Sequence, residues 1–381
     1  MFAGVREANE EALRDAVVLH VASHALYARD IAMRGDAEVK AARAVARAGL
    51  GGGGGGGGPA EEAPRDQGYT RPRVLVLLPH RNAAKSFVRT LLALCPWAKE
   101  VGNAKRFFAE YSEMDAPAPT EEDAPNGGTA PLDHRVMMRG NIDDDFRLGI
   151  SLSRRGVNLY AKFYAADIVL ASPLGVRRVA GGPGDRERDY DWMSSVELCV
   201  VEGADMLQQQ NWEHVTNAFG LINATPLADH GVDFSRVREW VLAGRGRAFR
   251  QTLILSRMFT PELSALARVH CGNAAGALRL VPVPRGVLPR VLPQVRQVVQ
   301  RVEAASHAAA ADARFEYFTK TVLPQVAGAR GARSAEALGG HVLIYIPTYF
   351  DYVRVRNHLL RTDVDFVACS ECAAARAQAH V

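Results

Sequence analysis

Val196–Leu207, which reads VELCVVEGADML, is the stretch that decides the fold. Its first half is a short apolar run with β-branched residues, which is typical of a buried strand in a parallel sheet. The run ends on Glu202-Gly203-Ala204-Asp205. Acidic residues at the carboxyl end of a parallel strand lie where open α/β sheets bind ligands. The stretch therefore predicts a ligand site in an α/β fold, with a strand followed by an arbitrary acidic turn as the alternative.

Three more short apolar runs, at 74–78, 164–171 and 251–255, have the same character. Helical stretches separate the four runs, which favours a parallel α/β sheet with its functional loops gathered at one edge. The first run leads into PHRNAA and the second into SPLGVRR, so each ends at a basic helix start. Free backbone N–H groups at a helix start suit phosphate oxygens, and Arg adds a fork-shaped cation. Contact with a nucleic-acid backbone is the functional interpretation, and an ordinary turn with a solvated Arg is the alternative.

Composition restricts the class of protein. A chain of 381 residues is long enough for two domains, and 48% hydrophobic residues suit a globular protein. The net charge of +4 is mild, which argues against a strongly basic coat but permits a local basic surface. No apolar run approaches the roughly 20 residues of a membrane span, so no membrane partner is expected. The odd, widely spread cysteines favour a reducing, intracellular compartment; they are Cys95, Cys199, Cys271, Cys369 and Cys372.

The tetrad after the deciding strand resembles that of DEAD-box helicases, in which it reads Asp-Glu-Ala-Asp. There the first acid holds Mg²⁺ and the second orients the attacking water. Glu202 in this chain is able to face a metal, but Gly203 has no side chain with which to activate water. The eight glycines of Gly51–Gly58 are followed by Pro-Ala-Glu-Glu, without the Lys and hydroxyl of a phosphate-binding loop. They predict a flexible linker, and the chain holds no GxxxxGK[ST] elsewhere.

The order of the loops is more specific than any one loop. Strand ends carrying PHRNAA, SPLGVRR, EGAD and SRM follow one another along the chain. Superfamily 2 helicases have PTRELA, TPGR, DEAD and SAT in the corresponding order. The resemblance predicts a RecA-like parallel sheet, and Arg257 departs from the pattern by standing within the Ser-Ala-Thr position.

Longer stretches resemble one family, that of digestive organ expansion factor and its yeast counterpart, U3 small nucleolar RNA-associated protein 25. The resemblance runs from about Leu13 to the C-terminus, apart from the glycine run and an acidic insertion. The stretches that carry it are GNIDDDFRLGISLSRRGVNLY, DIVLASPLGVRR, QNWEHV, HGVDFSRVREW and HVLIYIPTYFDYVRVRNHL.

The family resemblance implies a non-catalytic nucleolar factor of the small-subunit processome, needed for processing of pre-18S ribosomal RNA. It implies pre-ribosomal RNA, U3 small nucleolar ribonucleoprotein components and other processome proteins as partners, and no cofactor, metal or catalytic residue. An ATP-dependent RNA helicase with an atypical nucleotide site is the alternative. The remnants of the nucleotide site would be Glu202, Gly203, Asp205 and Ser256, and the candidate RNA-backbone contacts Arg81, Asn82, Pro173, Arg177 and Arg178.

The resemblance and the composition together predict one nearly complete RecA-like domain and the start of a second. Strands at 341–347 and 364–368 would open the second domain, which needs roughly 100 further residues to be complete. The predicted divisions are a helical segment at 1–48, a Gly-rich linker at 49–70, domain 1 at 71–270 with an acidic insertion at 114–133, a helical connector at 271–335, and the start of domain 2 at 336–381.

Three clusters of metal-binding residue types have no function in this scheme. His20 and His24 lie four residues apart on a predicted helix, but no third ligand accompanies them, so a helix surface or partner contact is favoured. Asp143-Asp144-Asp145 is interpreted as a solvated turn. Cys369 and Cys372 have no second pair to complete a zinc site.

Overall fold

The computed structural model describes residues 1–4, 9–47, 64–112, 140–182, 184–185, 187–280, 298–306, 308–328, 342–362, 364 and 366–368. The chain divides into two compact units. The first comprises Met1–Ala116 and Asp133–Pro284, and the second Pro117–Leu132 and Arg285–Val381. Each unit is described by itself.

The first unit is built on a nine-stranded sheet of the described residues, in the order β3-β5-β4-β6-β2-β7-β8-β1-β9. Neighbouring strands are parallel except for β4, which runs antiparallel to both β5 and β6. The strands are β1 (Phe2–Gly4), β2 (Val74–Leu77), β3 (Glu100–Gly102), β4 (Arg147–Leu152), β5 (Gly156–Leu159), β6 (Ile168–Ala171), β7 (Leu198–Val201), β8 (Gln251–Ser256) and β9 (Arg279–Leu280).

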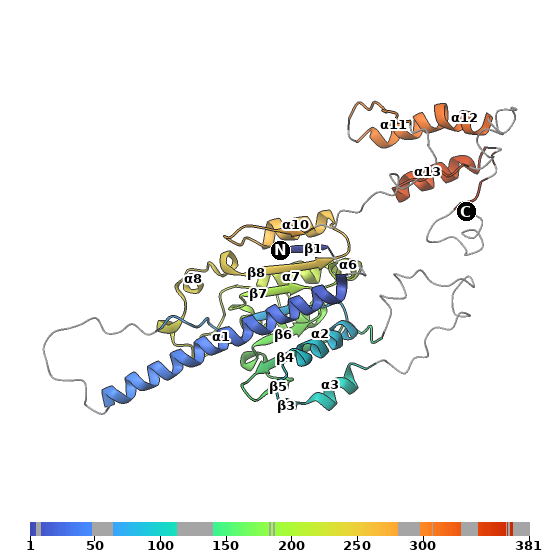
Figure 1. Ribbon diagram of the computed structural model, residues 1–381. Helices are drawn as coiled ribbons and strands as arrows, with labels where there is room; N and C mark the ends of the chain where they lie inside the picture. The colour runs from blue at the N-terminus through green and yellow to red at the C-terminus, as the bar shows by residue number, and fades with distance from the viewer. Residues whose placement is uncertain are drawn as a thin grey trace. The chain divides into compact units, whose positions relative to one another are not determined.

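Helices cover both faces of this sheet, as Figure 1 shows. Strand side chains alternate between faces, so Val74 and Val76 pack in the core under α1 and α2, while Leu75 and Leu77 pack on the opposite side. The helices are α1 (Glu10–Arg47), α2 (Arg81–Ala93), α3 (Ala104–Glu110), α5 (Pro173–Ala180), α6 (Ala204–Gln209), α7 (Trp212–Leu221), α8 (Glu239–Leu242), α9 (Gly246–Phe249) and α10 (Pro261–His270), with 3-10 turns at Phe163–Ala165, Asp191–Met193 and Phe234–Arg236.

The predicted fold class, α/β with a mostly parallel sheet, is confirmed. The four predicted strands are β2, β6, β7 and β8, but β6 begins only at Ile168, because Phe163–Ala165 forms a 3-10 turn. The helix expected over 1–48 instead begins at Glu10, because Phe2–Gly4 forms a parallel strand between β8 and β9. The antiparallel pair β4 and β5 was not predicted. In the helical stretch expected after β7, α6 and α7 are separate helices.

The end of the predicted linker packs onto the first unit. Gln67 forms a parallel bridge with Val237, and Thr70 donates its backbone N–H to Ser195 Oγ at 3.0 Å. Gly51–Gly58 and the predicted acidic insertion at 114–133 lie outside the described residues. The proposed domain boundaries stay a prediction.

The second unit is helical in its described part. It contains α11 (Ala310–Tyr317), a π-helical turn (Phe318–Val322), α12 (Leu323–Gly328) and α13 (Tyr349–Leu359), with a small core of Leu323, Val355 and Leu359. The prediction of strands at 341–347 and 364–368 is wrong. The structure describes 342–347, 364 and 366–368 of these ranges, and none of these residues lies in a strand. A strand needs a neighbour to complete its backbone hydrogen bonds, and the described residues of this unit supply none.

Candidate functional site: the carboxyl edge of the sheet

Register brings the predicted site residues to one edge of the sheet. Leu77, Ala171 and Val201 stand in one row across β2, β6 and β7, and Val201 pairs with Ile254 of β8. These strands are parallel, so the loops that follow them leave from the same edge. The antiparallel β4 begins there too, because Arg147 pairs with Ala171.

A chain of four ionic side chains occupies this edge beside β7 and β8. Arg14 Nε donates to Glu202 Oε1 at 2.9 Å, and an Arg14 NH2 group donates to Glu10 Oε1 at 3.1 Å. Arg257 reaches the other oxygen of Glu10 at 3.5 Å. The Glu202 side chain is only 13% exposed, and burial raises its pKa while the Arg14 guanidinium opposes that rise. We call these residues the Arg14 ion chain.

The other nucleotide-site candidates stabilise the loops around the Arg14 ion chain. Gly203 adopts a left-handed conformation, with φ of 65°, at the start of α6. Asp205 accepts from the backbone N–H of Arg257 at 3.3 Å, and its carboxylate lies 3.4 Å from Ser256 Oγ. Ser256 is fully buried, and its Oγ donates to Met258 O at 2.7 Å. Asp205 and Ser256 thus lie in contact beside the loop that carries Glu202, and their assignment as remnants of a nucleotide site stays a prediction.

Sequence reasoning missed Glu10 and Arg14. Both lie at the start of α1, which follows β1, and Gly4 at the end of β1 pairs with Ser256. The first turn of α1 is acidic, with Glu10 and Glu11. Acids at a helix N-terminus are favourable for the helix but repel phosphate. The acidic first turn and the i, i+4 pair of Glu10 and Arg14 were visible signals, whereas the contact with Glu202 was not.

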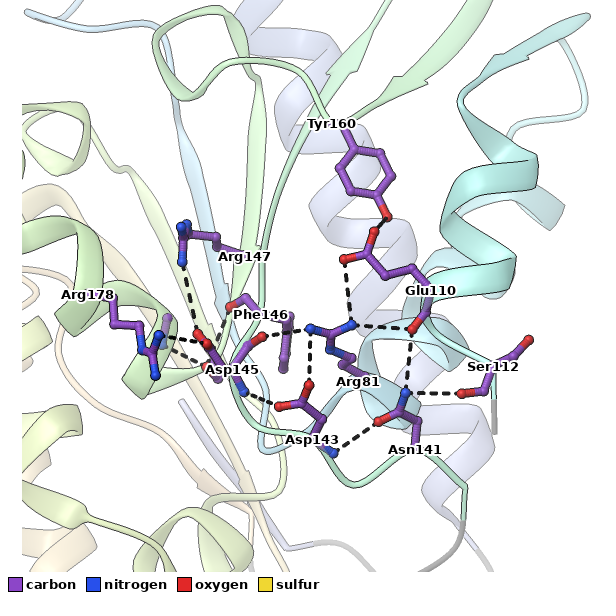
Figure 2. A network of polar contacts seen from close by, with 12 residues as sticks. Arg81, Glu110, Ser112, Asn141, Asp143, Asp145, Phe146, Arg147, Tyr160 and Arg178 are labelled. Atoms are coloured by element: carbon purple, nitrogen blue, oxygen red, sulfur yellow. Dashed lines mark hydrogen bonds and ion pairs between the residues drawn. The ribbon is translucent and has the colours of Figure 1, made fainter. Parts of the chain in front are cut away.

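The basic candidate Arg81 is enclosed by the segment before β4, as Figure 2 shows. Its side chain is 18% exposed, and it reaches Asp143 Oδ2 at 3.1 Å and donates to the Asp145 carbonyl at 3.0 Å. It also donates to the Glu110 carbonyl at 3.3 Å. At the N-terminus of α2, the backbone N–H groups of Arg81 and Asn82 donate to the carbonyls of Asp143 and Asn141, each at 2.9 Å. We call Asn141–Phe146 the acidic strap.

Arg178 of α5 and Arg147 at the start of β4 contact the same strap. Arg178 contacts Asp145 Oδ2 at 3.0 Å, and Arg147 lies 4.0 Å from Asp145 Oδ1 (Figure 2). The Arg178 side chain is 59% exposed. The three acids therefore differ from the solvated turn expected from sequence, since two of them pair with Arg side chains.

Two candidates lie away from the strap. Pro173 is buried as the first residue of α5, whose N-cap Ser172 accepts from the Gly175 N–H at 2.8 Å. Arg177 contacts Asp185 at 3.4 Å and lines a cavity of about 440 Å³ together with Arg188, His214 and His270. Burial lowers the pKa of His270, with the charges of Arg247 and Arg250 acting in the same direction. The five candidate RNA contacts thus do not form one patch, and their contact with RNA stays a prediction.

The two histidines of α1 contact the opposite, amino edge of the sheet. His20 Nε2 lies 2.7 Å from Gln251 Oε1, and His24 Nε2 lies 3.2 Å from Glu197 Oε2. Within the described ranges, no group of three His, Cys, Asp or Glu residues is arranged to hold a metal ion. In the same ranges, no helix combines the length and apolarity needed to cross a bilayer. Cys369 and Cys372 lie outside the described residues.

The comparisons with known proteins cover both units. Residues 1–278 match the family model "UTP25, NTP hydrolase-like domain", and residues 287–380 match "Utp25, C-terminal domain". The U3 small nucleolar RNA-associated protein 25 homolog of Xenopus tropicalis is 40% identical over 316 residues, covering 82% of this chain and 39% of the relative. The human homolog is 38% identical over 369 residues, covering 95% and 45%.

The match to a fungal relative covers a larger share of that relative's own length. U3 small nucleolar RNA-associated protein 25 of Schizosaccharomyces japonicus is 38% identical over 371 residues, covering 97% of this chain and 53% of the relative. The chain thus spans about half the length, or less, of these curated relatives. The family models cover most of the chain and agree with the relatives, so the chain belongs to the UTP25 family.

Proposed function

We propose that this chain is a non-catalytic nucleolar assembly factor of the small-subunit processome that binds RNA and proteins through a helicase-like scaffold. The names of the relatives associate those proteins with the U3 small nucleolar RNA. Carried to this chain, the association supports a nucleolar location, and the proposed partners are pre-18S ribosomal RNA and U3 ribonucleoprotein components. The fuller resemblance to digestive organ expansion factor belongs to this proposal as well.

The Arg14 ion chain is the observation that carries the non-catalytic part of the proposal. In α/β nucleotide-binding proteins, phosphates lie at the N-terminus of a helix that follows a parallel strand. Here the helix that follows β1 presents Glu10 at that end, and Arg14 pairs with the only acid that follows β7 directly, Glu202. The negative charge of Glu10 therefore lies where a phosphate would lie. Arg14 neutralises Glu202, the carboxylate that would face magnesium.

The second support is the backbone at Gly203. A DEAD-box enzyme has its catalytic Glu at this place, but the left-handed conformation of Gly203 is strained for any residue with a Cβ atom. A Cβ atom would also lie 3.3 Å from Pro79 Cγ. The loop is therefore adapted to glycine, which supports a degenerate member of the DEAD-box type rather than an enzyme with an unusual base.

Two measurements on the purified full chain test this proposal. Equilibrium binding of ATP with Mg²⁺, and steady-state hydrolysis with and without single-stranded RNA, are both expected to be at background. Turnover that is abolished by Glu202→Ala would establish the ATP-dependent helicase instead. Binding of single-stranded RNA is measured on the same preparation, and its absence would contradict the RNA-binding part.

A tagged copy expressed in cells of the protein's own species tests the assembly role. Small-subunit precursor RNA and U3 ribonucleoprotein components are expected to co-purify. A tagged copy that is expressed and folded but recovers neither would refute the proposed place in the processome.

A further inference from the structure

We propose that Arg81, Arg147 and Arg178 form a binding site for consecutive RNA phosphates, and that Asp143 and Asp145 of the acidic strap take the places of those phosphates when RNA is absent. The inference rests on the proposed RNA-binding function and adds the ligand group and its internal competitor.

The strap provides what two phosphates would provide. Phosphate oxygens pair with guanidinium groups and accept from the free N–H groups of a helix N-terminus. Asp143 and Asp145 bring two carboxylates to Arg81 and Arg178, at 3.1 and 3.0 Å. The strap carbonyls accept from the first N–H groups of α2. Most of the donors that would bind an RNA backbone here thus have an acceptor within the chain, and Arg81 Nε is an exception.

The topology explains why these groups converge. Arg81 follows β2 and Arg178 follows β6, two parallel neighbours, whereas the strap precedes β4. Because β4 runs antiparallel to β6, its beginning lies at the edge where β2 and β6 end. The reversed strand thus returns three successive acids to the edge that carries the Arg side chains.

The strap is an imperfect partner for these Arg side chains. Among the described residues, neither Arg81 Nε nor Asp145 Oδ1 has a hydrogen-bond partner, although both atoms are buried. Arg147 reaches Asp145 only at 4.0 Å, and its side chain is 47% exposed. An RNA phosphate carries its two charged oxygens on a tetrahedral phosphorus with ester oxygens beside them, whereas a carboxylate is planar, so a phosphate is able to reach donors that the strap leaves unpaired.

The strap is anchored at its two ends rather than along its length. Asn141 is buried and donates to Ser112 O at 3.0 Å, and Phe146 is buried in the core beside Tyr111. Asp143 and Asp145 lie between these anchors, with side chains 38% and 33% exposed. Displacement of their carboxylates therefore requires rearrangement of the middle of the strap only. Arg178, the most exposed of the three Arg side chains, is where an incoming phosphate first makes contact.

The middle acid provides a matched control. Asp144 carries the same charge one residue away, and no ion pair or side-chain hydrogen bond joins it to another described residue. Asn is the suitable replacement for Asp143, because the amide oxygen is able to keep the hydrogen bond that Asp143 Oδ1 accepts from the Asp145 N–H at 2.8 Å.

The experiment measures affinity for a fluorescent single-stranded RNA across a salt series, using the full chain. Asp143→Asn/Asp145→Asn is expected to bind about tenfold tighter than the unsubstituted chain, and Asp144→Asn within about twofold of it. Adding Arg178→Ala to the double variant is expected to remove most of the gain. An equal gain in Asp144→Asn would overturn the inference, since it would show a general field effect.

The other outcomes separate this inference from the proposed function. RNA binding by the unsubstituted chain with no gain in the double variant overturns the inference and leaves the RNA-binding function standing. No binding by any of these proteins overturns both. If the double variant does not fold, Asp145→Asn alone is used, because it leaves the contact between Asp143 and Arg81 in place.

Hydrogen exchange on the unsubstituted chain gives a second readout. In the strap, the Asp143 N–H donates to Asn141 Oδ1 at 3.0 Å and the Asp145 N–H donates to Asp143 Oδ1 at 2.8 Å. Saturating RNA is expected to displace the strap and therefore to speed hydrogen exchange at these two amides. Protection of these amides by RNA would show that the strap stays in place and would overturn the proposal.

Discussion

Arg14 in helix α1 donates a 2.9 Å hydrogen bond to Glu202 at the end of β7, across 188 positions of the sequence. The bond joins the first helix to the loop between β7 and α6. Because Arg14 also pairs with Glu10, its guanidinium is shared between two carboxylates. Without Arg14, the buried Glu202 carboxylate would lack this charged partner.

Arg14→Ala is expected to lower the free energy of unfolding by about 2–3 kcal/mol, because it leaves Glu202 buried without its partner. Urea denaturation at neutral pH measures this loss. Arg34→Ala, at an exposed position of the same helix, is the control and is expected to change stability by less than about 0.5 kcal/mol. Equal losses for the two variants would show that the ion pair has no special role.

Gly203→Ala is expected to destabilise the protein by about 1–2 kcal/mol, because a Cβ atom disfavours the left-handed backbone at φ of 65°. Gly203→Glu is expected to lose at least as much and to gain no ATP turnover. Gly220→Ala in α7 is the control, since a Cβ atom there has open space and suits a helix. Thermal denaturation compares the three, and a restored ATPase in Gly203→Glu would contradict the degenerate-site proposal.

Glu197 is expected to make stability depend on pH below neutrality. Burial alone would raise its pKa, but His24, Arg73 and Arg238 together lower it from 4.5 to about 2. A carboxyl with a lowered pKa in the folded state stabilises the protein above pH 4.5, and this contribution is lost as the pH falls from 4.5 toward 2.

Glu197→Gln should therefore cost on the order of 3 kcal/mol at pH 7 and little near pH 2. Urea titrations at several pH values test this difference. Glu239→Gln is the matched control, because the Glu239 side chain is 81% exposed and its pair with Arg65 lies at 3.7 Å. A pH slope that is the same in Glu197→Gln and the unsubstituted chain would refute the assignment.

Arg178→Ala is expected to weaken binding of single-stranded RNA similarly for different sequences, because phosphate contacts fix position without reading bases. The slope of log affinity against log salt should fall by about 0.7, the value for one phosphate contact on a single strand. Arg155→Ala, at an exposed position in the turn between β4 and β5 on the other edge, is the control. An unchanged slope in Arg178→Ala would place the RNA contacts elsewhere.

The parts of the fold that could be predicted from sequence are those that a local pattern determines. β2, β6 and β7 are fully buried apolar runs between turn signals, so their residues alone indicate strands. β1 and β9 have three and two residues, too few for a periodic pattern. They become strands because neighbouring backbone is present in the folded sheet, and this tertiary information is absent from the local sequence.

The candidate site divides in the same way. Glu202 and Ser256 were predictable because each lies at the end of a buried strand, and parallel strands end together. The role of Asp143 and Asp145 was not, since it depends on the reversed direction of β4 relative to β6. Three consecutive acids are usually solvated, and only the topology reveals that two of them face Arg81 and Arg178.

The position of β1 between β8 and β9 has a consequence for synthesis on the ribosome. Phe2 pairs with Ile254, so the earliest strand of the sheet is made long before its partner. At about 5–20 residues per second, the wait is roughly 10–50 s. During that time Phe2–Gly4 has no native neighbour, so β1 is expected to join the sheet only after β8 has been made.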